Sequence, residues 1–286
     1  MDDIKIDIGG VSETLFFILY SRAIESLSKD PIIQDQKSVE IVKILDKFLS
    51  ESDSKALKKL HKHRLPKYYV ILKALRTKKF DDYVKNFLSK NPNGIVVNMG
   101  CGLDTRFHRI NTDKGKFYDI DLPEVINFKK RVIKENERYH FISSSLHDYN
   151  WMDVLLKHKE QSFIFIAEGV FQYFYEKEVK SLIFELQKKF PGCKLAFDIT
   201  STYMKRKQNN RFYNAYFKFM TRLDQDVNIN FGIKKSQDIS SWNDRIELLD
   251  EFSYFDNKID KLKFFNYYKF LESIRRTDWI LLYKLT

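Results

Sequence analysis

The stretch Val97-Asn98-Met99-Gly100-Cys101-Gly102-Leu103-Asp104-Thr105-Arg106 decides the fold of this chain. It begins like the end of a buried strand, and its two glycines allow a tight turn before a helix. A second segment follows, Phe117-Tyr118-Asp119-Ile120-Asp121-Leu122-Pro123, in which a mainly apolar strand ends in an acidic residue. A glycine turn followed by an acidic strand end is typical of a parallel sheet that binds an adenosine-containing cofactor at its carboxyl edge.

The glycine turn favours S-adenosylmethionine (SAM) over other adenosine cofactors. A dinucleotide fingerprint needs G-x-G-x-x-G, and here Thr105 stands where the third glycine would be. The turn also lacks the G-K-[ST] ending of a phosphate-binding P-loop. SAM has no phosphate, so two glycines are enough. We expect Gly100 and Gly102 to let the backbone approach the methionyl part, and Asp121 to accept hydrogen bonds from the ribose hydroxyls.

The pattern of apolar residues changes near residue 94. Before it, apolar residues in 12–90 recur at helical spacing. After it, short apolar strands alternate with helical stretches, which implies right-handed crossovers and a parallel sheet covered by helices on both faces. The expected strands are 94–99, 116–120, 139–143, 162–167 and 194–199, with helices near 123–136, 150–159 and 176–189. Two further strands, near 246–254 and 278–285 with a helical piece between them, complete the pattern.

These elements predict the α/β fold of a class I SAM-dependent methyltransferase, with a Rossmann-like sheet. A plain dehydrogenase sheet fits less well, because the last two strands lack an ordinary crossover. We expect one methyltransferase domain over residues 1–286. It would comprise a helical N-terminal cap (1–90), a SAM-binding α/β core (91–200), an insertion or lid after the fifth strand (201–245) and a C-terminal strand pair (246–286).

Bulk composition adds weaker constraints. The 286-residue chain has a formal net charge of +11, but lysines and acids are interleaved, as in Lys177-Glu178-Val179-Lys180, which indicates solvated helix faces more than a nucleic-acid surface. Cys101 and Cys193 lack metal-type spacing, so we expect a reduced protein without a metal site. The segment from Met1 to Lys5 does not resemble a signal peptide, and no apolar run is long enough to span a bilayer. We therefore expect a cytoplasmic protein.

Three motifs carry a resemblance to a known family. Asn98-x-Gly100-x-Gly102-Leu103-Asp104-Thr105-Arg106 resembles the N-L-G-A-G-L-D-T-R motif of the leucine carboxyl methyltransferase family, more closely its bacterial branch, the polyketide-synthesis O-methyltransferases. The segment from Asp119 to Val125 resembles D-x-D-x-P, and the segment from Ala167 to Phe174 resembles A-E-G-x-x-x-Y-L. Further segments that fit are Ser12-Glu13-Thr14, Ser21-Arg22-Ala23, Asp30-Pro31-Ile32-Ile33, Asp35, Leu75–Asp82 and Ser253–Asp256.

The resemblance implies roles for individual residues. Arg76 and Arg22 would bind the methionyl carboxylate of SAM, since an arginine fork pairs with a carboxylate bidentately. Gly100 would lie under the methionyl part, and Asp121 would hold the ribose. Glu168, at the end of the fourth strand, would face the amino group of SAM or the reacting centre. A surface arginine at position 22 and a helix-terminal acid at position 168 are the structural alternatives.

One position departs from the family pattern. The family usually has Asp-Leu after the third strand, where the acid contacts adenine, whereas this chain has Ser145-Leu146. A serine hydroxyl accepts a hydrogen bond from the adenine amine more weakly than a carboxylate does. We expect either a lower cofactor affinity or a contribution from Asp148.

The acceptor is less constrained than the cofactor. A carboxylate acceptor needs no base, whereas a hydroxyl needs one; Glu168 and Tyr173 are the predicted catalytic residues, with His147 and Tyr203 as further candidates. Residues 1–50 and 201–235 are expected to cover the site. The aromatics that would either line an apolar substrate pocket or pack in the core, which their helical spacing fits equally well, are Phe212, Tyr213, Tyr216, Phe217 and Phe219.

Three functions remain open at this stage. The first is an O-methyltransferase acting on a carboxylate or hydroxyl of a small, polyketide-like molecule, with S-adenosylhomocysteine (SAH) as the other product. The second is a protein C-terminal leucine carboxyl methyltransferase. The third, suggested only by charge, is a nucleic-acid methyltransferase or RNA-binding protein. We expect the first, with a small-molecule acceptor, no nucleic-acid or membrane partner, and a monomer or homodimer.

Overall fold

A seven-stranded sheet forms the centre of the computed structural model, which describes residues 13–51, 60, 62, 65–208, 210, 229–254, 261–262 and 278–286. The strand order is β3-β2-β1-β4-β5-β7-β6. The strands are β1 (Ile95–Met99), β2 (Lys116–Asp121), β3 (Tyr139–Ser143), β4 (Phe163–Ala167), β5 (Cys193–Thr200), β6 (Ile246–Ser253) and β7 (Asp278–Leu285). Strands β1 to β5 are parallel, and β7 is antiparallel to both β5 and β6. The predicted fold class is confirmed.

The sequences of the central strands explain their position. All five residues of β1, with the sequence IVVNM, are buried, and so are all five of β4, with the sequence FIFIA. A parallel strand covered by helices on both faces is apolar along its whole length rather than at alternate positions. The short apolar runs therefore identified the middle of the sheet.

Three helices precede the first strand among the described residues, and the others lie in the connections between strands. The helices are α1 (Glu13–Ser26), α2 (Gln36–Glu51), α4 (Lys67–Lys90), α5 (Arg106–Ile110), α6 (Pro123–Val132), α7 (Trp151–Leu156), η1 (Phe171–Tyr173), α8 (Glu176–Lys189), α9 (Thr202–Gln208) and α11 (Gln237–Ser240). Pro123 is the first residue of α6, where its missing N–H costs nothing. Helix α8 begins where the Glu178 carboxylate accepts a hydrogen bond from the Tyr175 N–H, at 2.7 Å.

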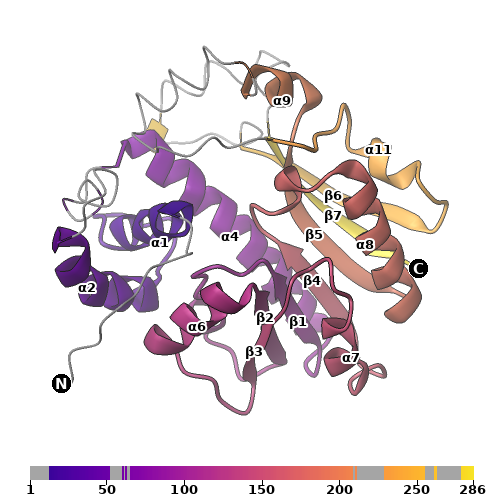
Figure 1. Ribbon diagram of the computed structural model, residues 1–286, viewed down its shortest axis with the longest axis horizontal. Coiled ribbons are helices and arrows are strands. Elements are labelled where there is room, and N and C mark those ends of the chain that lie inside the picture. The colour runs from indigo at the N-terminus through magenta and orange to yellow at the C-terminus, as the bar shows by residue number, and fades with distance from the viewer. Residues whose placement is uncertain are drawn as a thin grey trace.

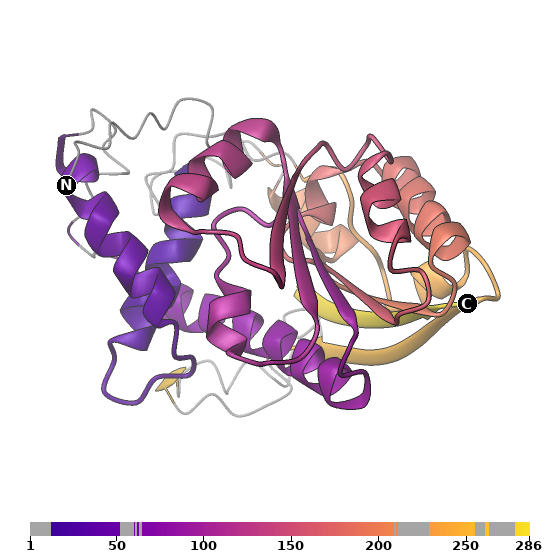
Figure 2. The same ribbon diagram turned by 90° about the horizontal axis from the view of Figure 1, so that it is seen from below.

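The sheet separates two hydrophobic cores. On one face, side chains of α1, α2, α4 and α6 pack on alternate residues of the strands, including Val96, Ile164 and Ala196. On the other face, side chains of α7 and α8 pack on Val97 and Phe165. Figure 2 shows α4 and the α7/α8 pair on opposite sides of the sheet. In Figure 1, α1 and α2 lie beside α4, at one side of the molecule.

Parts of the predicted cover lie outside the described residues. These parts are residues 1–12 and the aromatic run with Phe212, Tyr213, Tyr216, Phe217 and Phe219. Most of the predicted helical piece between β6 and β7 also lies outside the described residues. Of the insertion, the structure describes α9 and residues 229–245. Asn230 and Phe231 donate backbone hydrogen bonds to the Gln172 carbonyl, at 2.8 and 3.2 Å, which fixes this segment against η1. None of the described helices is both long and apolar enough to cross a membrane.

Candidate active site

The glycine turn after β1 adopts a conformation that requires glycine. Gly100 has a φ of 62° and Gly102 a φ of 49°, both in the left-handed region. A Cβ on Gly100 would lie 2.7 Å from Cγ2 of Val170, and one on Gly102 would lie 2.8 Å from Cδ2 of Leu15. The turn is therefore packed between the loop after β4 and helix α1.

The predicted acidic strand end meets this turn. Asp121, the last residue of β2, accepts a hydrogen bond on Oδ2 from the Gly102 N–H at 2.7 Å, and on Oδ1 from the Leu122 N–H at 2.8 Å. Burial raises the pKa of the Asp121 carboxyl, although the two N–H groups act in the opposite direction. An ionised carboxylate has about four acceptor positions. Two oxygens with free lone pairs beside a glycine turn fit the two hydroxyls of a ribose.

The adenine-side residues follow β3, the neighbour of β2. In the parallel register Ser143 lies opposite Asp121, and the Ser144 N–H bonds to the Asp121 carbonyl at 2.9 Å. Leu146 is buried, as expected of a side chain that would make an apolar contact with the adenine ring. The Ser145 hydroxyl oxygen accepts a hydrogen bond from the His147 N–H at 3.3 Å, so part of its accepting capacity is already used.

Two arginines hold Glu168, the residue that follows β4. Its Oε1 accepts from Nε of Arg76 at 3.0 Å, and its Oε2 from Nη2 of Arg106 at 2.6 Å. Burial opposes the charged carboxylate, but Arg76 and then Arg106 outweigh burial and keep the pKa of Glu168 below its usual value. A carboxylate held in this way is a weak proton acceptor. It is better suited to binding a cationic group than to general base catalysis.

Arg76 also connects this site to β5. Its Nη1 lies 3.0 Å from Oδ2 of Asp198, whose Oδ1 accepts from the Gly169 N–H at 2.5 Å. Gly169 has a φ of 72°, and a Cβ there would lie 3.3 Å from Nη1 of Arg76. The glycine in the Glu168-Gly169 pair thus gives the arginine room against the backbone.

Arg22 lies at the glycine turn, but protein groups occupy its guanidinium. Its Nη2 donates to the Leu103 carbonyl at 2.7 Å, its Nε donates to Asp35 at 3.0 Å, and its Nη1 lies 3.9 Å from Asp104. The side chain is buried, so it ties helix α1 to the turn. The surface-arginine alternative is excluded, while a direct role of Arg22 in cofactor binding stays a prediction.

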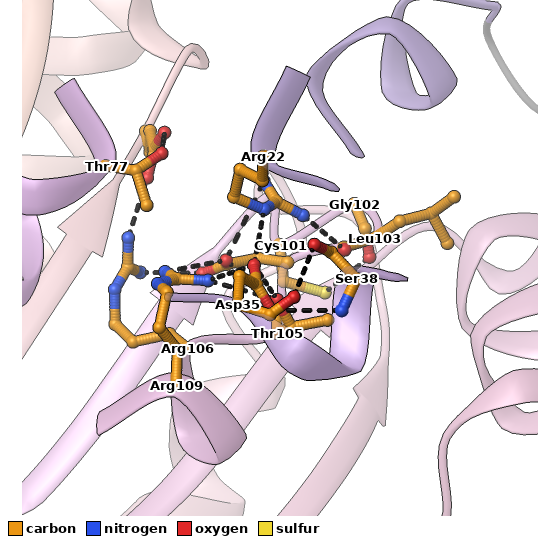
Figure 3. A network of polar contacts seen from close by, with 12 residues as sticks. Arg22, Asp35, Ser38, Thr77, Cys101, Gly102, Leu103, Thr105, Arg106 and Arg109 are labelled. Atoms are coloured by element: carbon orange, nitrogen blue, oxygen red, sulfur yellow. Dashed lines mark hydrogen bonds and ion pairs between the residues drawn. The ribbon is translucent and has the colours of Figure 1, made fainter. Parts of the chain in front are cut away.

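A network of buried ions surrounds the contact between Arg22 and the glycine turn, and no role was predicted for most of its members. Arg109 bonds to Asp35 at 2.9 Å, to Asp81 at 2.6 Å and to Asp104 at 3.1 Å. Figure 3 shows Arg22, Arg106 and Arg109 directed at one cluster of oxygen atoms. Burial disfavours the ionised Asp35 carboxylate, but Arg109 and Arg22 hold its pKa below its usual value. In the sequence, the only sign of this buried network was the presence of charged residues within otherwise apolar helical segments.

Tyr173 lies in η1, at the outer end of this edge. Its side chain is 42% exposed, and its carbonyl accepts from Nδ2 of Asn230 at 2.8 Å. Partial burial raises the pKa of its hydroxyl, so the phenol is protonated near neutral pH. His147 lies nearby along the loop after β3, where its ring stacks on Phe174 with 4.5 Å between centroids. The surroundings of Tyr173 and of His147 do not identify either residue as a general base.

Comparison with known proteins decides the family. The family model described as leucine carboxyl methyltransferase matches residues 16–187, more than half of the chain.

The chain belongs to the leucine carboxyl methyltransferase family.

This confirms the resemblance drawn from the glycine turn, the D-x-D-x-P-like segment and the Glu168 segment, and the chain is a SAM-dependent methyltransferase. All nine predicted site residues lie within the matched range.

Two curated relatives are similar to this chain over about two thirds of its length. The tetracenomycin polyketide synthesis O-methyltransferase TcmP of Streptomyces glaucescens is 26% identical over 68% of this chain and 67% of its own length. The S-adenosyl-L-methionine-dependent methyltransferase dpfgK of Gibberella zeae is 26% identical over 64% of this chain and 62% of its own length. Among solved structures, magnesium protoporphyrin IX methyltransferase from Synechocystis PCC 6803 is similar at 11% identity and a TM-score of 0.46, over 85% of this chain and 99% of its own.

At the carboxyl edge of the sheet, negatively and positively charged side chains occupy different positions around the glycine turn. Asp121 and Glu168 present carboxylates on either side of the turn, and Arg76 presents a guanidinium between Glu168 and Asp198. The groups of SAM with hydrogen bonds to make are the ribose hydroxyls, an ammonium and a carboxylate. The residues present therefore fit SAM, the methyl donor. Its ammonium and its carboxylate would each meet a described side chain of opposite charge.

Proposed function

We propose that this methyltransferase transfers the methyl group of SAM to an oxygen atom of a small molecule, at a hydroxyl or a carboxylate. The observation that carries the proposal is the segment Glu168-Gly169-Val170, whose acid is bound by Arg76 and whose valine covers Gly100. Enzymes that methylate amino groups of bases usually place an Asn/Asp-Pro-Pro-aromatic run there. The TcmP relative is named as an O-methyltransferase, which supports the same chemistry.

The binding roles follow from the contacts at the sheet edge. Asp121 accepts from the ribose hydroxyls, the backbone at Gly100 and Gly102 approaches the methionyl part, and Ser145 with Leu146 meets adenine. Bound SAM supplies an electrophilic methyl carbon, and the chain's task is to orient it and exclude water.

Arg76 is placed to bind the methionyl carboxylate, and Glu168 to bind the amino group. Within the described residues, no protein group bonds to Nη2 of Arg76, which leaves an N–H pair for a second carboxylate. Arg22 acts from the opposite side of the turn. It contributes by fixing Leu103 and by adding positive charge near the donor's carboxylate.

A small acceptor fits better than a protein or nucleic acid. Helix α1 covers the turn through Leu15, which lies against Gly102. Its buried residues Phe16 and Leu19 are part of the core that includes the sheet. A site beneath such a cover admits a small molecule more readily than the end of a folded chain. We propose no nucleic-acid or membrane partner, and a monomer or homodimer as the active form.

Methyl transfer from isotopically labelled SAM tests the proposal. The full chain is incubated with small aromatic hydroxyl compounds and carboxylic acids, a peptide ending in leucine, and an RNA pool. Label in a small-molecule ether or ester supports the proposal, and label only in the peptide or only in RNA refutes it. Asp121→Asn should abolish most of the transfer. Asp113→Asn, at an exposed loop position, is the matched control and should keep it.

A further inference from the structure

Lys73 is a lysine beside the proposed site whose amine lies over an aromatic ring. It lies on α4, one turn before Arg76, and its side chain is half-buried. Its Nζ lies 5.4 Å from the centroid of the Tyr69 ring. In the described ranges no hydrogen-bond acceptor or carboxylate lies within bonding distance of this amine. A partly buried lysine without an ion-pair partner among the described residues is unusual for a purely structural residue.

Three acidic side chains, Asp198, Asp278 and Glu168, act electrostatically on this amine without bonding to it. Asp198 and Thr200 alternate with Ala196 on the face of β5 that α4 covers. Asp278, the first residue of β7, lies opposite Thr200 in the antiparallel register. Glu168 lies across the Arg76 guanidinium from Asp198. Because Asp198, Asp278 and Glu168 all act on the Lys73 amine electrostatically, we infer that it lies near the carboxyl ends of β4 and β5, where the acceptor must approach the donor.

The protonation of Lys73 reflects this position. Burial and then the Arg76 guanidinium lower the pKa of the Lys73 amine to about 8, against the smaller opposite effect of Asp198, Asp278 and Glu168. A substantial fraction of the amine is thus neutral slightly above physiological pH. A neutral amine has a lone pair that can accept a proton.

We propose that Lys73 is the general base of the reaction and that the acceptor oxygen belongs to a hydroxyl, not a carboxylate. This inference rests on the proposed O-methyl transfer and narrows its acceptor. The hydroxyl O–H bond breaks as its proton moves to the Lys73 lone pair. The acceptor oxygen forms a bond to the methyl carbon, and the C–S bond breaks with its electrons remaining on sulfur, which becomes the neutral thioether. Lys73 is left as an ammonium and returns its proton to water.

The charges around Lys73 favour this direction of proton transfer. Asp198 and Asp278 stabilise the ammonium that forms, because opposite charges favour the protonated amine. A carboxylate acceptor needs no base, so a neutral amine at this position favours a hydroxyl acceptor. Glu168 itself is held ionised by two arginines, and Tyr173 is a phenol with a raised pKa, so neither is a better base.

Competitive labelling tests the amine without requiring an acceptor. The full chain with bound SAH is treated with trace acetic anhydride between pH 6 and 11, and each lysine is quantified by mass spectrometry. Lys73 should reach half of its maximal labelling near pH 8, well below the exposed lysines of α4. If Lys73 labels over the same pH range as the exposed lysines, the proposal is overturned.

Turnover tests the catalytic role. Matched pairs of aromatic hydroxyl compounds and carboxylic acids are offered to the parent, to Lys73→Met and to Lys85→Met, an exposed control on the same helix. Lys73→Met should reduce hydroxyl methylation by about 100-fold or more and leave SAH affinity within about twofold. Lys73→Ala, which leaves space for an added amine, should regain activity with ethylamine. Methylation of carboxylates alone, or unchanged activity of Lys73→Met, overturns the proposal. If the parent binds SAM but methylates neither class, the proposed function fails and the base role fails with it, whereas the labelling result still reports the protonation of the Lys73 amine.

Discussion

Replacing Arg106 by methionine tests the buried ion network most severely. Arg106 is 1% exposed. Its guanidinium lies 3.0 Å from Asp81, 3.0 Å from Asp104 and 2.6 Å from Glu168, and it also donates to the Asn98 side chain. Removing one partner of a buried ion pair typically costs about 3–5 kcal/mol, because the remaining charge stays buried and uncompensated.

The structure places Arg106→Met at the lower end of that range. Arg109 continues to pair with Asp81 and Asp104, and Arg76 with Glu168, so no carboxylate loses its last cation. We expect a loss of about 3 kcal/mol in the free energy of unfolding.

Urea denaturation followed by circular dichroism measures the effect of Arg106→Met. The control is Lys78→Met, which removes an exposed ion pair with Asp82 and should cost no more than about 0.5 kcal/mol. A loss below about 1 kcal/mol for Arg106→Met would show that the network does not hold the site together.

Three further outcomes are expected. Asp121→Ala should weaken SAM binding by about 1.5–3 kcal/mol, the scale of lost hydrogen bonds to a charged group, in a calorimetric titration of folded protein. Gly100→Ala should lower the unfolding free energy by at least about 1–2 kcal/mol, because φ is 62° and the new Cβ meets Val170; an unchanged urea midpoint would contradict this. Asp35 and Glu168 have lowered pKa values in the folded state, so their contribution to stability is present above pH about 4 and is lost as the pH falls further. The melting temperature should therefore drop steeply below pH 4, and a flat profile would argue against these shifts.

The sheet was predictable from the sequence because its signals are local. A continuous apolar run such as Phe163–Ala167 can only be satisfied by burial on both faces. The glycine turn and Asp121 could also be paired in advance, since parallel strand ends meet at one edge of a sheet. The contact between the Gly102 N–H and the Asp121 carboxylate is the structural form of that expectation.

The charged interior was not predictable in the same way. Asp35 and Arg109 are 74 positions apart and form a 2.9 Å contact only because α1, α2 and α5 converge at the turn. Nothing in the local sequence around Lys73 distinguishes it from a solvated surface lysine. Its burial depends on α4 crossing the face of β5, and on Asp278 being brought beside Thr200 by the antiparallel β7.

Calorimetric titration of the full chain with SAM, SAH and NAD tests the central claim most directly. The glycine turn, Asp121 and the Arg76–Glu168 pair form a site for a donor with a ribose, an ammonium and a carboxylate but no phosphate. SAM and SAH should therefore bind with similar affinities in the micromolar range, about −8 kcal/mol, and NAD should give no heat of binding. Binding of NAD without binding of SAM would contradict the account.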